Sequence, residues 1–277
     1  MRLTADGYGI RDRGLRPLAN PADLCALEQA MRMAREQRGN LTVFSIGPAR
    51  VDDLLRLGLS LGAHRAVRVW HPAFEGGDVV AESHLLQRVV EILDCDYFVT
   101  GTRLLDRGSD PVPALAAAGR NVPCVTAAVD YLFQNDEIRV LRKSDRGAKQ
   151  VVALKTPCTL LFEDGCCEMR YPDQGALMRA LAARIEHWGL AELGLPLAEL
   201  GSCAARLRRE QYGVPRPNPK RVVTPDATLP AFDRILALLS GGIKPREGKL
   251  NQVSPGETVE KLVAIFRSQG LLAGGQK

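Results

Sequence analysis

The stretch that decides the fold runs from residue 41 to residue 69 and reads LTVFSIGPARVDDLLRLGLSLGAHRAVRV. It opens with a continuous apolar segment, LTVFSI (41–46), which is typical of a strand buried on both faces. The hydrophobic spacing that follows predicts a helix over 50–61, and AVRVW (66–70) predicts a second strand. A strand, a helix and a strand in this order indicate a parallel sheet covered by helices.

The same alternation continues on both sides of this stretch. Residues 20–37 predict a helix with Asn20 as its N-cap and Pro21 at its first position. The apolar residues that would form one face of this helix are Leu24, Leu27, Met31 and Ala34. Downstream, the pattern predicts a helix at 79–93, a strand at 96–101, a helix near 111–119 and a strand at 123–128. We therefore expect an α/β fold with a doubly wound, mainly parallel sheet.

The pattern changes after residue 128, where short apolar segments alternate with an Asn-Asp turn and a Gly-containing turn. This spacing predicts antiparallel hairpin strands. Helices are then predicted at 174–187, 197–210, 228–239 and 256–270, the last three separated by Pro- and Gly-rich connectors. We expect residues 1–190 to form an α/β nucleotide-binding-type domain. Residues 191–277 are expected to form an extended, helical C-terminal arm that packs on this domain or on a partner subunit.

Composition and charge bound the function class. The chain has 277 residues, 45% of them hydrophobic, which is enough for one sizeable core and an appendage. No apolar run approaches the roughly 20 residues of a membrane-spanning helix, so we expect no membrane insertion and a cytoplasmic protein. The net charge is +5, and its densest cluster, within 206–221, includes a single aromatic residue, Tyr212. A solvated or protein-docking surface is expected there, and no nucleic-acid binding.

Cysteine and histidine spacing argues against a metal site. The seven cysteines include no C-x-x-C pair, and the four histidines have no partner at ligand spacing. We expect buried free thiols that act as small hydrophobic residues, and no metal. The vicinal pair Cys166-Cys167 has two explanations: a redox-active pair, or a strand end with one side chain inward and one outward.

One element is missing from the expected fold. The chain reaches its first helix at residue 20 with no strand before it, although a doubly wound sheet normally opens with a strand whose following turn contacts nucleotide. Either the sheet lacks a strand, or the sequence begins late.

The chain resembles the β subunits of electron transfer flavoproteins. Six blocks carry the resemblance in the same order: residues 20–35, SIGPARVDDLLRLGLSLGAHRAVRV (45–69), FEGGDVVAES (74–83), TGTRLLDRGSDPVPALAA (100–117), 154–171 and 254–272. Phe74-x-Gly76-x-Asp78, the TPC segment (156–158) and Trp188 are most similar to the branch that includes nitrogen-fixation-linked and electron-bifurcating members. Members of the family open with a strand upstream of what is seen here, so we expect Met1 to be an internal or misassigned start.

The resemblance implies a nucleotide crevice at the carboxyl ends of the parallel strands. In the family this crevice holds AMP, or a second FAD in bifurcating members, while the FAD common to all members is bound mostly by the α subunit. The positions expected to bind the cofactor are Asn20, Ser45, Ile46, Gly47, Gly101, Thr102, Asp106, Ser109, Asp110 and Val112.

Physical roles can be assigned to several of these positions. Residues 45–47 end one strand and present backbone amides, and Gly101 permits the close approach of a ligand. The hydroxyl of Ser109 can cap the helix that starts near Pro111, where free N–H groups favour phosphate.

Structural explanations stand beside these roles. Asn20 is a good helix start on its own, and Asp106 and Asp110 are typical capping or turn residues. Asp78 is expected to be a plain N-cap.

The segment 106–114 departs from the family pattern. Pro111 and Pro113 lack an N–H group, so two backbone contacts to a phosphate are lost. Asp110 adds negative charge that repels a diphosphate unless Arg107 or Arg103 offsets it. Ala22 also stands where many members carry an aromatic residue.

The partner-recognition segment departs as well. It reads DQGALMRALAARIEHW (173–188), with Gln174 in place of the family's leucine anchor and few of its lysines. Leu177 and Met178 can still offer an apolar anchor for docking. We therefore expect a redox partner, a dehydrogenase or quinone reductase, that differs from a standard acyl-CoA dehydrogenase.

These observations favour a β-type subunit of a heterodimeric electron transfer flavoprotein, paired with an α-type subunit and supporting electron transfer between a dehydrogenase and a redox acceptor through FAD. No residue is expected to act as an acid, base or nucleophile, because redox chemistry belongs to the cofactor. Two alternatives stay open. One is a structural paralogue with a decayed nucleotide site, and the other is a subunit of an NAD-linked electron-bifurcating enzyme.

Overall fold

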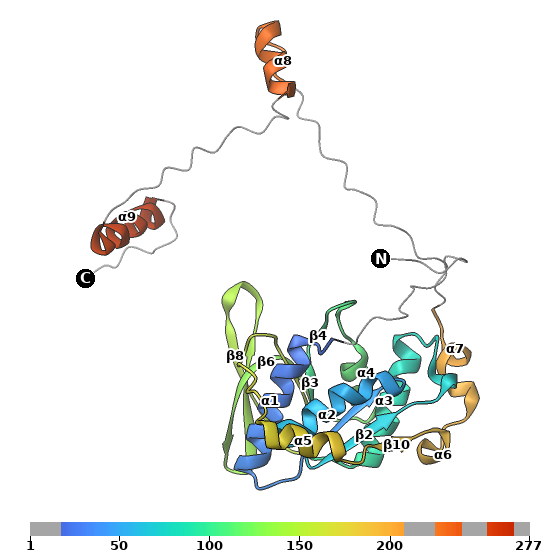
Figure 1. The fold of residues 1–277 in the computed structure, drawn as a ribbon. Helices are drawn as coiled ribbons and strands as arrows, with labels where there is room; N and C mark the ends of the chain where they lie inside the picture. The colour runs from blue at the N-terminus through green and yellow to red at the C-terminus, as the bar shows by residue number, and fades with distance from the viewer. Residues whose placement is uncertain (1–17, 208–224, 240–253, 269–277) are drawn as a thin grey trace. The chain divides into compact units, whose positions relative to one another are not determined.

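The computed structural model describes residues 18–207, 225–239 and 254–268 (Figure 1). The chain divides into two units, Met1–Gly213 and Val214–Lys277. The second unit contains α8 (Ala231–Leu239) and α9 (Pro255–Ser268). In the described part of the chain, no helix is both long enough and apolar enough to cross a membrane.

The first unit contains a three-stranded parallel sheet with the order β1-β2-β10. Its strands are β1 (Thr42–Ile46), β2 (Arg65–Val69) and β10 (Glu186–Trp188). Val67 and Val69 of the central strand are fully buried. The prediction that β1 is buried on both faces is wrong, because four of its residues are only half-buried and Ile46 is exposed. Among the described strands β1 pairs with β2 alone and lies at the edge of the sheet.

A second sheet has the order β3-β9-β6-β7-β8. Its strands are β3 (Tyr97–Gly101), β9 (Cys158–Phe162), β6 (Cys124–Gln134), β7 (Glu137–Lys143) and β8 (Lys149–Leu154). The last three form the predicted antiparallel hairpins, and Asn135 and Asp136 turn the first one with φ angles of 52° and 59°. The strand β9 does not continue these hairpins. It pairs in parallel with β3 and β6, and all five of its residues are buried.

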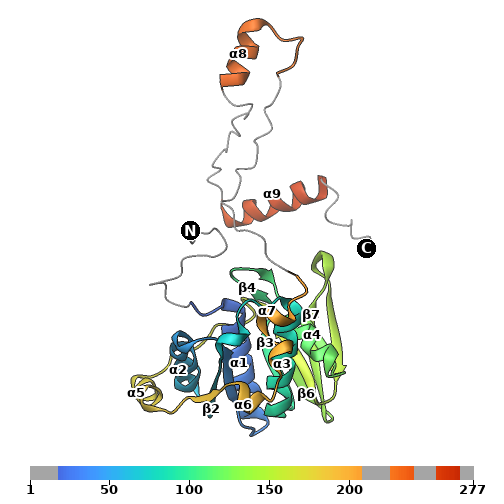
Figure 2. The same ribbon diagram turned by 90° about the vertical axis from the view of Figure 1, so that its right-hand side faces the viewer.

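Helices cover both faces of these sheets (Figures 1 and 2). On one face, α1 (Pro21–Glu36) packs on β3 and β9, and α2 (Asp52–Leu61) packs on β1 and β2. On the other face, α3 (Val79–Leu93) and α4 (Val112–Gly119) pack together around Phe98 of β3. The predicted doubly wound α/β fold is therefore confirmed.

The buried face of α1 differs from the predicted one. Met31 is buried, but Leu24, Leu27 and Ala34 are only half-buried. The residues of α1 that enter the core of the second sheet are Ala26 and Met33. The periodicity identified the helix but not its orientation, because α1 also borders the cavity described below.

The predicted helix over 174–187 is wrong in its second half. The helix α5 (Gln174–Ala182) ends where Arg56 of α2 donates hydrogen bonds to the carbonyl groups of Ala180, Leu181 and Ala183 (2.8, 2.8 and 3.2 Å). The chain then forms β10 because Trp188 is buried against β2 and Glu186 accepts two hydrogen bonds from Arg65.

The segment after residue 190 also folds onto the first unit. The helices α6 (Leu190–Leu193) and α7 (Gly201–Ala204) flank a short 3-10 turn (Leu197–Glu199), so the helix predicted at 197–210 is shorter and interrupted, with 208–210 outside the described residues. Leu193 and Leu200 are fully buried against β2 and α3. Residues 191–207, which we expected in the arm, therefore contribute to the core of the first unit.

The two sheets present strand edges to one cavity. Residues of both β1 and β3 line a cavity of about 1180 Å³, and Phe44 of β1 stacks on Phe98 of β3 with ring centroids 5.9 Å apart. In the described structure, β1 pairs only with β2, and β3 pairs only with β9. Half of the backbone groups of each strand therefore point toward the cavity instead of toward a neighbouring strand.

Hydrogen exchange tests this arrangement of the two sheets. We expect the amides of β1 and β3 that face the cavity to exchange at least about tenfold faster than those of the central strands β2 and β9, because unpaired edge amides open without breaking a ladder. Amide exchange read by NMR or by mass spectrometry of short peptides measures this difference. Equal protection of edge and central strands would mean that another segment pairs with these edges.

Candidate functional site

The cavity runs along the facing edges of β1 and β3. Its end at the carboxyl ends of these strands, here called the mouth, is where the nucleotide crevice is predicted. Five of the ten predicted positions line it: Asn20, Ser45, Ile46, Asp110 and Val112. The other five lie around it without lining it: Gly47, Gly101, Thr102, Asp106 and Ser109. The structure thus brings half of the predicted residues together on one surface.

Ser45, Ile46 and Gly47 end β1 as predicted, but they do not all offer free amides. The N–H of Gly47 donates to the carbonyl of Val69 (3.0 Å), which extends the pairing of β1 with β2 by one residue. Gly47 is buried, and a Cβ atom there would lie 2.7 Å from Cγ1 of Val51. Ser45 and Ile46 are therefore the residues of this turn that face the cavity.

The start of α1 is held to the end of β3 by Asp23, a residue that sequence reasoning missed. Its Oδ1 accepts hydrogen bonds from the N–H of Gly101 (2.7 Å) and the hydroxyl of Thr100 (3.1 Å). Asn20 occupies the N-cap position, but its amide donates to Asp23 Oδ2 (3.0 Å) and to the carbonyl of Arg103 instead of capping the helix. The one sequence signal for Asp23 was an acidic residue in the first helical turn.

Gly101 and Thr102 serve the packing of the fold in this structure. A Cβ atom on Gly101 would lie 2.7 Å from the Cβ of Ala22 and 2.8 Å from the N of Asp23, so the close approach that this glycine permits is that of α1. The hydroxyl of Thr102 donates to the carbonyl of Phe162 (2.8 Å), and its N–H bonds to the same oxygen (2.9 Å). Both residues therefore fix the elements that surround the crevice and do not line it themselves.

The loop before α4 forms a small hairpin of β4 (Arg103–Leu104) and β5 (Gly108–Ser109). Asp106 and Ser109 are exposed on it. The predicted capping of α4 by Ser109 is wrong, because Ser109 belongs to β5. Asp110 caps the helix instead, and its Oδ1 accepts a hydrogen bond from the N–H of Val112 (3.1 Å).

The start of α4 has few N–H groups left for an anion. Pro111 and Pro113 have none, and the N–H of Val112 is bound to Asp110. Among residues 111–114, Ala114 is therefore the one whose N–H is not removed by proline or bound to Asp110. A phosphate at this helix N-terminus would therefore find one backbone donor where an ordinary first turn offers several.

Carboxylates dominate the charge at the mouth of the cavity. Burial raises the pKa of Asp110, and the nearby carboxylates of Asp23 and Asp106 raise it further. The Val112 amide and the Arg107 guanidinium act in the opposite direction and lower it. Of the described residues that line the cavity, Arg107 is the one cation, and it donates to both carboxylate oxygens of Glu82 (3.2 and 2.9 Å). The positive charge of Arg107 is thus already paired with Glu82 of α3, so little positive charge remains at the mouth to offset a diphosphate.

Asp78 is the N-cap of α3, as predicted. Its Oδ1 accepts from the N–H groups of Val80 (3.1 Å) and Ala81 (3.0 Å). Its Oδ2 accepts from the N–H groups of Arg206 and Leu207, both at 2.8 Å. These four hydrogen bonds lower the pKa of Asp78 and tie the segment after α7 to the start of α3.

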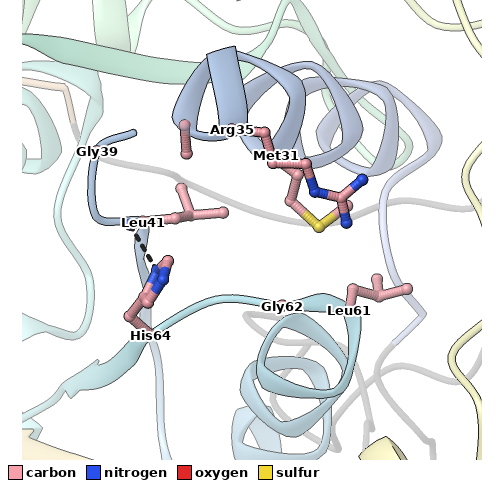
Figure 3. Close-up of a pocket in the computed structure, with 8 residues that line it drawn as sticks. Met31, Arg35, Gly39, Leu41, Leu61, Gly62 and His64 are labelled. Atoms are coloured by element: carbon pink, nitrogen blue, oxygen red, sulfur yellow. Dashed lines mark hydrogen bonds between the residues drawn. The ribbon is translucent and has the colours of Figure 1, made fainter. Parts of the chain in front are cut away.

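A smaller pocket of about 220 Å³ lies at the opposite end of the strands (Figure 3). It is lined by the end of α1, the end of α2 and Leu41, which precedes β1. His64 accepts a hydrogen bond from the N–H of Leu41 (3.0 Å) at its rim. None of the ten predicted positions lines this pocket, which shares Ala34, Gly39 and Leu41 with the lining of the larger cavity.

The predicted docking residues lie on α5, which is held at both ends. Asp173 caps its start by accepting from the N–H of Ala176 (2.7 Å), and Arg56 binds its last carbonyl groups. Leu177 is 41% exposed, Met178 60% and Leu181 53%. The helix therefore presents three apolar side chains outward from a fixed backbone.

Substitution of Gly101 tests the packing at the back of the crevice. Gly101→Ala should destabilise the protein by about 2 kcal/mol or more, because the new methyl group overlaps the backbone of α1. The matched control is Gly39→Ala, since a Cβ atom at Gly39 would meet nothing within 4 Å, and it should change stability by less than about 0.5 kcal/mol. Urea unfolding measures both values, and equal stability of the two variants would contradict this account.

Comparison with known proteins agrees with this fold. Residues 10–193 match the family model described as electron transfer flavoprotein domain. The chain is 30% identical over 220 residues to Protein FixA of Azotobacter vinelandii, covering 76% of this chain and 78% of that one. It is 28% identical over 217 residues to the electron transfer flavoprotein subunit beta of Methylophilus methylotrophus (77% and 82%), and 28% over 195 residues to that of Clostridium acetobutylicum (70% and 74%). The chain therefore belongs to the electron transfer flavoprotein family.

Proposed function

We propose that this chain is the β-type subunit of a heterodimeric electron transfer flavoprotein. It pairs with an α-type subunit that holds most of the FAD, and it supports electron transfer between a dehydrogenase and a redox acceptor. The observation that carries the proposal is the meeting of Asn20, Ser45, Ile46, Asp110 and Val112 at one cavity mouth in a chain of this family. The names of its relatives, beta subunits among them, support the same role.

The crevice is proposed to take an adenine nucleotide, AMP or a second FAD. Leu24, Ile46 and Val112 provide apolar walls suited to an adenine ring, and Asn20 and Ser45 carry polar groups suited to ribose hydroxyls. The carboxylates of Asp23, Glu82 and Asp110 disfavour each added phosphate charge. Of the two nucleotides, AMP brings one phosphate to this mouth and FAD brings two, so the charge favours AMP.

The residues around the crevice have binding and positioning roles. When bound, the flavin supplies the redox chemistry, and the protein supplies orientation and electrostatics. Asp23 and Thr102 fix α1 and the end of β3, and Asp110 fixes the start of α4. The chain is therefore proposed to act as a non-catalytic subunit of an electron carrier.

A second candidate is a structural paralogue whose crevice is not used. The start of α4 favours it, because Pro111 and Pro113 remove two N–H groups and Asp110 takes a third. In this case the chain would shape the flavin site of the α-type subunit without holding a nucleotide of its own.

Nucleotide content separates these candidates. The chain is co-expressed with the α-type subunit from the neighbouring reading frame, purified and denatured, and the released nucleotides are quantified. We expect one FAD and one AMP per heterodimer. One FAD alone would support the structural paralogue, two FAD would support a bifurcating subunit, and failure to capture an α-type subunit would contradict all three.

A charge substitution tests whether the mouth itself binds the nucleotide. Asp110→Asn should tighten AMP binding several-fold, because it removes a negative charge while asparagine still caps α4. Asp106→Asn is the control, since Asp106 is 77% exposed and does not line the cavity. Isothermal titration of the heterodimer with AMP measures both. If Asp106→Asn changes affinity as much as Asp110→Asn, the phosphate does not bind at the mouth.

The exposed face of α5 is proposed to dock the redox partner. Met178→Glu should slow electron transfer to or from that partner by at least about tenfold, since a charge at the centre of an apolar anchor costs more than 1.4 kcal/mol. The control is Leu132→Glu on β6, because Leu132 is also 60% exposed. Stopped-flow reduction of the FAD measures the rates, and equal rates for both variants at unchanged FAD content would contradict docking at α5.

A further inference from the structure

Three cysteines that are distant in the sequence meet outside the crevice. The Sγ atoms of Cys25, Cys166 and Cys167 all lie within 4.8 Å of one another. Cys25 belongs to α1 and is 6% exposed, while the vicinal pair is half-buried in the turn that follows β9. The pair is thus not a strand end with one side chain inward and one outward. It turns both thiols toward α1.

Reciprocal hydrogen bonds hold the turn on the helix. The thiol of Cys25 donates to the carbonyl of Cys167 (3.3 Å), and the thiol of Cys167 donates to the carbonyl of Cys25 (3.5 Å). Farther along, Arg170 donates to both carboxylate oxygens of Glu28, which is 3% exposed. The turn is therefore fixed to α1 on both sides of the cluster, so the three sulfur atoms are arranged in advance of any ligand.

A buried amide completes the surroundings of the cluster. Gln29 is 2% exposed, and its Nε2 group donates to Cys166 Sγ (4.0 Å). Its Oε1 has no hydrogen-bond partner among the described residues. An N–H group directed at sulfur stabilises the thiolate form and resembles the outer-shell bonds that orient metal ligands. This polar side chain therefore points to a ligand at the cluster.

We propose that Cys25, Cys166 and Cys167 form a binding site for one soft, monovalent metal ion of the copper(I) class. An ion about 2.3 Å from each of three sulfur atoms places these atoms about 4 Å apart, and the three Sγ atoms already lie within 4.8 Å of one another. Thiolates select copper(I) and zinc, and zinc requires a fourth ligand. In the described structure no histidine, aspartate or glutamate joins the three cysteines, which favours the three-coordinate ion.

Binding is an exchange of protons for metal with no electron transfer. Each thiol that ligates the ion releases its proton to solvent as the sulfur–metal bond forms. Because each ligating thiol gives up its proton, the affinity should increase as the pH rises.

Anaerobic titration of the full chain with copper(I), in competition with a chromogenic copper(I) chelator, tests the site. We expect one copper(I) per chain, and a loss of at least about 100-fold in affinity in Cys25→Ser, since a lost ligand costs at least as much as a lost outer-shell partner. Cys203→Ser is the control, because Cys203 is exposed and outside the cluster, and it should bind as the unaltered chain does. Equal affinity of Cys25→Ser and Cys203→Ser, or no copper retained, would overturn the proposal.

A second measurement keeps the test independent of how the variants fold. X-ray absorption at the copper edge of the loaded, unaltered chain should show three sulfur neighbours at about 2.3 Å. A first shell of nitrogen or oxygen atoms would overturn the assignment. The parallel titration with zinc(II) should show weaker binding, and tighter binding of zinc than of copper(I) would contradict the three-coordinate site.

Discussion

The architecture depends on the carboxylate of Asp23, which joins the first turn of α1 to the end of β3. It accepts hydrogen bonds from Gly101 and Thr100, and it is in turn bound by Asn20. Because Gly101 has no side chain, the helix can lie directly on the strand end. This contact sets where α1 begins, and α1 then borders the cavity along its length and carries the buried Cys25.

The same contact explains the unusual electrostatics of the crevice. Asp23 is needed to hold the helix, Asp110 caps α4, and Glu82 binds Arg107. Each carboxylate therefore has a structural partner, yet all three face the mouth of one cavity. A nucleotide that binds here must place its charged end away from these groups or bring a counter-charge. The fold thus sets the ligand preference of the site through residues that serve its own stability.

Much of the fold could be predicted from the sequence, since hydrophobic periodicity reports local structure. The alternation of strands and helices from 41 to 119 and the Asn135-Asp136 hairpin are confirmed. Pairing between distant segments could not be predicted, because periodicity carries no information about neighbours. For that reason β9 was expected among the hairpins, and β10 was expected to be helical.

The location of the candidate site could be predicted from the sequence, but the roles of its individual residues could not. The strand ends placed Ser45 and Ile46 at the cavity, but the residue that caps α4 depended on whether Ser109 joined a strand. Asp23 resembled any acidic residue in a first helical turn. The thiol cluster was out of reach, because Cys25 and Cys167 are 142 residues apart in the chain. Tertiary contacts of this kind become visible only in three dimensions.

The two carboxylate oxygens of Asp78 connect the start of α3 to the chain segment at Arg206 and Leu207. One oxygen caps α3, and the other holds the backbone of Arg206 and Leu207, the last described residues before the second unit. One turn further along α3, Glu82 holds Arg107 at the mouth of the cavity. A pull on the chain at residue 207 would therefore act first on the cap of α3.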